Sequence, residues 1–166
     1  MQEHNFSEYF DYYISKIKED SITEALEKGR QGVVELTANL TEDQWKFAYD
    51  EGKWNVGQLL YHMLDTERIM CCRALSFARG QKSELPGYDH DVFAEGVDIV
   101  FSTKNLFLKE YDCMRKGTML MFQGFSSDQL QKVAHFNGLH IEVGDMARLI
   151  AGHEQHHLEI LRTRYL

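Results

Sequence analysis

The sequence predicts an all-α fold, a four-helix bundle with short extra helices. Apolar residues recur at helical rather than alternating spacing along nearly the whole chain of 166 residues. The chain contains one proline, so long helices meet few obligatory breaks. The length and the 43% hydrophobic content suit one core. We therefore expect a single domain over residues 1–166.

The first helical segment is predicted to run from about residue 7 to residue 40. Gly29 and Gly32 weaken the middle of this segment and predict a bend there. Thr41 and Gln44 then form a T-x-x-Q capping box. This pattern predicts that a short separate helix follows the first segment.

The second helix has the clearest beginning. Asn55 is a good N-cap residue, and Gln58 follows three positions later, directly before an apolar run. The helical pattern continues through Phe77 and should end near Gly80, where a glycine favours termination.

The remaining elements follow from turn and cap signals. The segment QKSELPGYDHD, residues 81–91, holds the single proline and predicts a loop. A third helix is expected over about 97–122, and an S-x-x-Q box at 126–129 predicts a short helix. Residues 135–140 are expected to be irregular, and the last helix should run over about 143–162. Four main helices can then share one core.

Charge and cysteine content exclude several classes of function. A net charge of −8 argues against binding to nucleic acids and to anionic membranes. We find no apolar run of 18 residues and no secretory signal in the opening residues, so we expect no membrane partner. Cys71, Cys72 and Cys113 do not form a disulfide framework and are interpreted as inert core thiols. These features favour a cytoplasmic location.

Three histidines form the most informative pattern. His153 and His157 lie four residues apart in the last predicted helix, so both imidazoles project from one face and can chelate one ion. His62 lies in the otherwise apolar stretch LLYHML, where an unpartnered imidazole would cost about 1–3 kcal/mol. Metal coordination removes that cost. Three imidazoles would leave a fourth position for water or substrate, which is typical of catalytic sites.

Other metal arrangements are weaker. His156 points about 100° away from His157 around the helix and is interpreted as a neighbouring residue. The cluster at residues 89–91, D-H-D, is interpreted as a solvated group in a loop. Glu154 and His157 match the E-x-x-H signature of di-iron bundles, but those sites need two such motifs and the sequence has no second one. The pattern therefore favours a mononuclear site.

Two carboxylates near His62 are candidate catalytic residues. Asp65 lies three residues after His62, near enough to orient its imidazole. Either Asp65 or Glu67 could orient a ligand or move a proton. A buried ion pair between Glu67 and Arg73, or between Asp65 and an arginine, would instead be structural. Both interpretations remain open at this point.

Two segments resemble the characteristic segments of the DinB / YfiT-like superfamily. They are GKWNVGQLLYHMLDTERIMCCRALSFARGQKSELPGYDHD and the ending LIAGHEQHHLEILRTRYL, and the resemblance extends over essentially the whole chain. The resemblance implies a DinB-like bundle with up-down-down-up topology, commonly a homodimer. It also implies that His62, His153 and His157 coordinate one divalent metal ion.

The resemblance further implies an enzyme that activates a low-molecular-weight thiol. Characterised members of the superfamily include bacillithiol transferases and mycothiol-dependent maleylpyruvate isomerases, so the expected partners are a small thiol and an electrophilic substrate. Hydrolysis by water at the same site is a second possibility. A third is a non-catalytic metal-binding or stress-response protein, which a fourth ligand from His156 or Glu154 would favour. Zinc is the preferred ion, followed by nickel, iron or manganese, which accept the same ligands.

Overall fold

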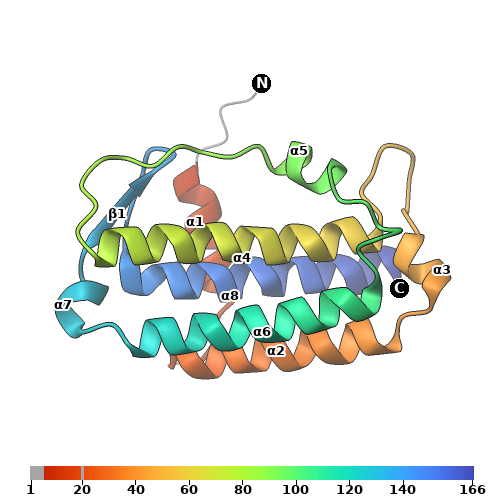
Figure 1. The fold of residues 1–166 in the computed structure, drawn as a ribbon, viewed down its shortest axis with the longest axis horizontal. Coiled ribbons are helices and arrows are strands. Elements are labelled where there is room, and N and C mark those ends of the chain that lie inside the picture. Colours follow the sequence, from red (N-terminus) through yellow and green to blue (C-terminus); the bar gives the residue numbers. More distant parts are fainter. Residues whose placement is uncertain (1–5, 20) are drawn as a thin grey trace.

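Four long helices form a bundle in the computed structural model, which describes residues 6–19 and 21–166. The four helices are α2 (Ile22–Asn39), α4 (Val56–Ala78), α6 (Lys104–Gln123) and α8 (Val143–Ile160). Helix α8 packs against α2 and α4, and α6 packs against the same two helices. Figure 1 shows that α2 and α8 run in one direction and α4 and α6 in the other. The predicted bundle and its up-down-down-up order are confirmed.

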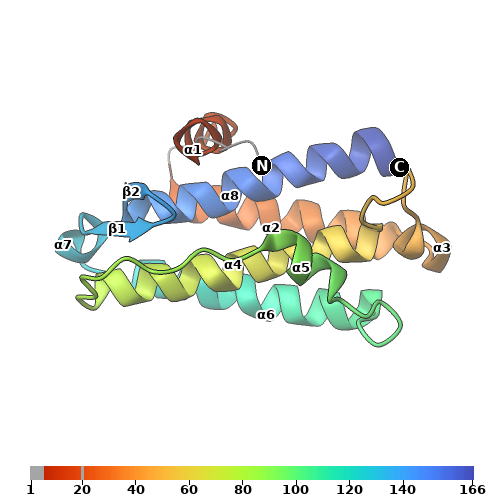
Figure 2. The ribbon, with the colours of Figure 1, turned by 90° about the horizontal axis from the view of Figure 1, so that it is seen from above.

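The N-terminal part differs from the prediction of one bent segment over residues 7–40. It consists of α1 (Phe6–Ser15) and the separate helix α2, which begins where the Ser21 hydroxyl accepts a hydrogen bond from the Glu24 amide at 3.4 Å. Helix α1 crosses α8 (Figure 2). Gly29 and Gly32, expected to mark a bend, both lie inside the uninterrupted helix α2, and the predicted segment is instead divided between Ser15 and Ile22.

The three capping boxes that the sequence predicts are all present. In each of them the N-cap side chain accepts a hydrogen bond from the third residue of the helix, whose side chain accepts one from the N-cap amide. They begin α3 (Glu42–Lys46), α4 and α7 (Ser127–Leu130). Helix α4 ends at Ala78, close to the predicted stop, and Gly80 follows with φ +107°.

A crossover of residues 79–103 connects the parallel helices α4 and α6 along the length of the bundle (Figure 1). It contains a short helix, α5 (His90–Glu95), that was not predicted from the sequence. The third long helix begins at Lys104 and not near residue 97, because the Thr103 hydroxyl caps it by accepting a hydrogen bond from the Leu106 amide at 3.3 Å. The crossover therefore reaches further along the chain than predicted.

Residues 135–140, expected to be irregular, belong to a hairpin. Strands β1 (Val133–Phe136) and β2 (Leu139–Glu142) pair antiparallel. Asn137 and Gly138 connect them with φ +51° and +71°, as a type I′ turn requires. The Asn-Gly pair was the signal that could have predicted it. The chain ends in a π-helical turn, η1 (Leu161–Tyr165), that extends α8.

A layer of buried charge separates two apolar clusters inside the bundle. In α4, buried apolar residues lie before and after Glu67, and in α8 they lie before and after Glu154. Arg115 and Thr118 occupy the corresponding position in α6. Within the ranges 6–19 and 21–166, no helix has both the length and the apolar character needed to cross a membrane.

Helix α1 approaches α8 closely at Gly152. A Cβ atom at this position would lie 2.0 Å from the backbone oxygen of Tyr13, so Gly152→Ala should push α1 away. We expect a local loss of about 1–3 kcal/mol, the usual range for overpacking. Faster amide hydrogen exchange confined to α1 would show it.

The matched control is Gly117→Ala, on the exposed face of α6. A Cβ atom there would meet nothing within 4 Å. This change should therefore stabilise the protein by about 0.5–1 kcal/mol, since alanine favours the helix. Unchanged exchange in α1 of the Gly152→Ala variant would show that the two helices are not tightly docked.

Candidate metal centre

The three predicted histidines converge in the structure. His62 comes from α4, and His153 and His157 come from successive turns of α8. The Nε2 atom of His153 lies 3.1 Å from that of His62 and 3.0 Å from that of His157. Two nitrogen ligands of a tetrahedral zinc ion, each at about 2.05 Å, are about 3.3 Å apart. The spacing of the three ring nitrogens is therefore close to that of metal ligands.

The electrostatics of the cluster also suit a cation. Burial lowers the pKa of His62 to about 4. Burial, and then the neighbouring imidazoles, lower the pKa values of His153 and His157 well below the ordinary value. All three side chains are consequently neutral near pH 7, the state in which imidazole binds metals. The convergent nitrogens and the neutral donor set fit one divalent ion.

Aromatic rings hold the imidazoles in place. The ring of Trp54 lies 4.8 Å from that of His62, and the ring of Tyr13 meets that of His153 edge-on at 5.4 Å. Contacts of this kind limit the rotation of both rings. The aromatic surroundings also keep the cluster away from bulk water, so its geometry depends on α1 and on the segment before α4 as well as on the helices that supply the histidines.

The two residues that could have supplied a fourth ligand point elsewhere. His156 lies against α1, where its Nδ1 is 3.1 Å from the hydroxyl oxygen of Tyr12. Glu154 points into the bundle interior. In the described part of the chain, the group of side chains able to hold an ion consists of His62, His153 and His157.

A cavity of about 370 Å³ opens beside the three histidines, within the usual size range of ligand sites. Its walls come from α1, α4, α8, the crossover and the hairpin. His90 of α5 also lines it, with its ring 6.0 Å from that of His62. The prediction of a solvated D-H-D cluster missed this placement of His90. Asp89 accepts hydrogen bonds from the first amides of α5, and this capping signal could have predicted the helix.

The two predicted catalytic carboxylates lie away from the cavity. Asp65 accepts a hydrogen bond from Arg68 at 2.8 Å, and Arg68 also contacts Glu110 at 2.6 Å on the α4–α6 surface. Glu67 is buried between the helices. Neither carboxylate is among the described residues that line the cavity. Asp65 and Glu67 therefore both pair with an arginine, as the structural interpretation of these two carboxylates predicted.

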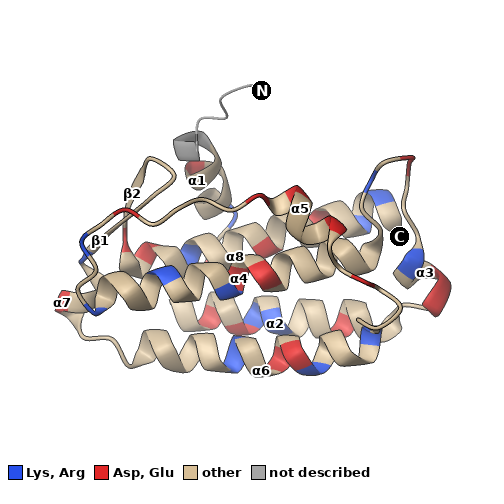
Figure 3. Ribbon diagram, turned by 45° about the horizontal axis from the view of Figure 1, so that its top comes forward, with Lys and Arg blue, Asp and Glu red and all other residues tan. Residues whose placement is uncertain are grey.

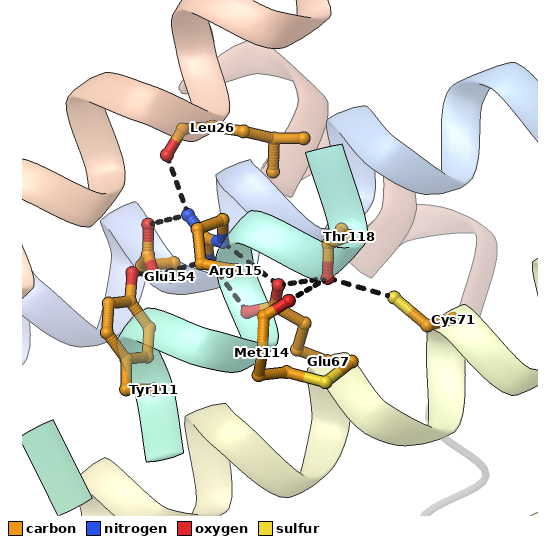
Figure 4. A network of polar contacts seen from close by, with 8 residues as sticks. All are labelled: Leu26, Glu67, Cys71, Tyr111, Met114, Arg115, Thr118 and Glu154. Carbon is orange, nitrogen blue, oxygen red and sulfur yellow. Dashed lines mark hydrogen bonds and ion pairs between the residues drawn. The ribbon is translucent and has the colours of Figure 1, made fainter. Parts of the chain in front are cut away.

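Arg115, from α6, is the partner of Glu67, in place of the predicted Arg73 (Figure 4). Its guanidinium donates two hydrogen bonds to Glu67, both at 2.9 Å, and two to Glu154 at 2.9 and 2.6 Å. A fifth bond goes to the carbonyl of Leu26 at 2.9 Å. All five guanidinium N–H groups are thus satisfied in the bundle interior.

Hydroxyl groups complete this buried network. Thr118 donates to Glu67 at 2.6 Å, and Tyr111 donates to Glu154 (Figure 4). Burial alone would lower the pKa of Arg115, but the carboxylates of Glu154 and Glu67 raise it well above its usual value. Arg115 is therefore charged at every ordinary pH, and the network acts as a structural layer across the bundle.

The cysteines are divided between core and surface. Cys71 is buried beside Thr118, with its Sγ 3.2 Å from the hydroxyl, and burial raises its pKa to about 12. This matches an inert core thiol. Cys72 and Cys113 are exposed, so their predicted place in the core is wrong. Adjacent residues of a helix point about 100° apart, so Cys72 faces outward where Cys71 faces the core.

Comparisons with known proteins agree with this fold. The family profile described as the DinB superfamily matches residues 25–161. A protein of Oceanobacillus iheyensis, whose name assigns it provisionally to the metal-dependent hydrolases, is 24% identical over 126 residues. That match covers 75% of this chain and 72% of the relative.

The fold is also similar to a solved structure, YfiT from Bacillus subtilis. The two structures superpose with a TM-score of 0.74 over 86% of this chain and 85% of the other, at 18% identity. YfiT is described as "a probable metal-dependent hydrolase with an unusual four-helix bundle topology". At this level of identity the similarity is one of fold.

Proposed function

Because the chain belongs to the DinB superfamily, we propose that it is a metal-dependent enzyme whose ion is held by His62, His153 and His157. The observation that carries the proposal is the convergence of three neutral imidazoles at the wall of a cavity. A site with three protein ligands leaves a position for a small molecule, as catalytic zinc sites do. A divalent ion supplies, when bound, the Lewis acidity that lowers the pKa of a coordinated thiol or water. Zinc is the preferred ion.

A small thiol is the nucleophile that the cavity favours. No Asp or Glu occurs among the described residues that line it, so the chain offers no carboxylate base at the reacting position. A thiol would need none, because its ordinary pKa of about 8.5 is already close to neutral and a bound divalent ion would lower it further. In the proposed reaction the sulfur electron pair forms a bond to an electrophilic carbon, the leaving group departs with the electrons of its own bond to that carbon, and the thiol proton passes to solvent.

Water is the second candidate nucleophile, with a hydrolase as the result. The names of the relatives support it, and so does the position of the His90 imidazole at the cavity wall. In either reaction, Tyr13, Trp54 and Met70 supply apolar surface that binds the substrate and limits the access of water.

Titration of thiols into the cobalt-substituted protein separates the candidates. For thiol activation we expect a sulfur-to-cobalt band in the visible and near-ultraviolet spectrum, together with thiol-dependent conversion of a bimane halide. Both signals should be lost in His62→Ala and retained in His156→Ala. A spectrum unchanged by every thiol, with nitrophenyl ester hydrolysis that depends on His62, would assign the site to water. Metal-dependent stability without either reaction would overturn the enzymatic proposal.

A further inference from the structure

Arg73 is a buried cation at the wall of the cavity, and no acidic side chain of the described part of the chain forms an ion pair with it. It is only 3% exposed. Its guanidinium donates to the carbonyl oxygen of Pro86 at 2.7 Å, contacts the Met70 sulfur at 3.9 Å and lies 4.5 Å from the centre of the Phe136 ring. These contacts engage two of its five N–H groups. Arg115, which is also buried, has two carboxylate partners, so the fold itself shows what a structural arginine needs.

The cavity is cationic although the protein is acidic. Arg73 is the only permanently charged residue among the described residues that line it. The net charge of the chain is −8, and acidic residues predominate along the crossover and α5 (Figure 3). The guanidinium is therefore not part of a basic surface. A buried charge of this kind is costly unless a counter-charge compensates it, and a bound ligand can supply that counter-charge.

The position of Arg73 relative to the histidines defines the shape of the ligand. His62, Thr66, Met70 and Arg73 follow one another at positions i, i+4, i+8 and i+11 and form a single stripe of α4 along the cavity. Eleven residues correspond to about 16 Å of helix. The cavity thus has the three histidines near one end of this stripe and the guanidinium at the other. Hydroxyl groups of Thr66 and Tyr88, 2.6 Å apart, lie between them.

We propose that the cavity binds an elongated ligand whose carboxylate group is held by Arg73 while its reacting end lies at the three histidines. Only the placement of the reacting end at the three histidines rests on the proposed function, and the carboxylate site at Arg73 does not depend on it. The planar guanidinium matches a carboxylate through two parallel hydrogen bonds. Apolar side chains between the two ends, such as Met70 and Leu149, suit an aliphatic spacer. The substrate class is therefore a thiol or electrophile that carries a carboxylate at some distance from its reacting atom.

Calorimetry with two matched ligand series tests the inference on the zinc-loaded protein. One series consists of linear ω-mercaptoalkanoic acids, and the other of ω-mercaptoalcohols of the same lengths. We expect the acid to bind at least tenfold more tightly than the alcohol over a narrow range of lengths. Arg73→Met should remove this preference, and Arg73→Lys should retain part of it. Arg79→Met, at the exposed C-terminal end of the same helix, should leave it unchanged.

The possible results separate the inference from the function on which it rests. Metal content should stay at one ion per chain in the three arginine variants, whereas His62→Ala, which lacks a proposed ligand, serves as the control for the metal site. Equal affinities of acids and alcohols at all lengths would overturn the role of Arg73 while leaving the metal centre intact. A preference that persists in Arg73→Met but disappears in His62→Ala would place the carboxylate on the metal and overturn the inference as well. A protein that binds no metal but still prefers the acids would contradict the proposed function and support the carboxylate site.

Discussion

Replacing His153 by alanine is expected to weaken zinc binding by at least about two orders of magnitude. The Nε2 atom of His153 is the central one, 3.1 Å from that of His62 and 3.0 Å from that of His157. Its removal leaves two imidazoles on separate helices, and even losses outside the ligand set cost about 10- to 100-fold. Competition with a chromophoric chelator measures the change.

His156→Ala is the matched control for this prediction. It removes an imidazole from the same helix that contacts Tyr12 and lies outside the convergent group. Zinc should raise the melting temperature of the His156→Ala protein as it does that of the unchanged protein, because a ligand that binds only the folded state stabilises it. The increase should disappear in His153→Ala. Equal zinc affinity in the two variants would exclude the three-histidine centre.

The metal cluster could be predicted because its signals are local. Two histidines four residues apart share a helix face, and a histidine inside an apolar run needs a partner. The cavity around them could not be predicted in the same way. Arg73 and His90 line it because the crossover folds back over α4, and no spacing in the sequence encodes that path.

The fold shows the same difference between local signals, which the sequence reveals, and long-range contacts, which it does not. Capping boxes at Thr41, Asn55 and Ser126 are complete within four residues, and all three predicted the start of a helix. The start of α6 was missed because apolar spacing continues before Thr103, although Val100 and Phe101 remain exposed. The sequence therefore predicted the helix starts that have a complete capping box. It did not predict the start of α6, where the Thr103 hydroxyl alone forms the cap.

Gly29 illustrates a residue whose role depends on a distant part of the chain. Its low helix propensity predicted a weak point and a bend in the helix. A Cβ atom at this position would lie 1.9 Å from an oxygen of Glu154, so the glycine makes room for a carboxylate 125 positions further along. The partner of Glu67 was mistaken for the same reason, because Arg115 reaches it from α6. The roles of Gly29 and of Glu67 both depend on a contact with another helix.

Replacing Arg115 by methionine is expected to reduce the free energy of unfolding by about 3–5 kcal/mol, the usual result of removing one partner of a buried ion pair. The change leaves Glu67 and Glu154, both buried, without their counter-charge. Urea denaturation of the metal-free protein measures the loss. The triple variant Arg115→Met, Glu67→Gln, Glu154→Gln should recover part of it, because neutral amides are less costly to bury than carboxylates. A loss below about 1 kcal/mol would contradict the role of the network.

The loss of stability in Arg115→Met should also depend on pH, and it should grow as the pH rises. Burial already raises the pKa of Glu154, even with Arg115 beside it. Without the guanidinium, which lowers it, the folded-state pKa of Glu154 should lie still further above the unfolded value. Groups shifted in this direction bind more protons in the folded state, so stability falls as pH rises through the folded-state pKa values. The difference from the unchanged protein should therefore be smaller near about pH 5 than near about pH 8, and it should lose its pH dependence in the triple variant, which carries no ionisable carboxyl at either position.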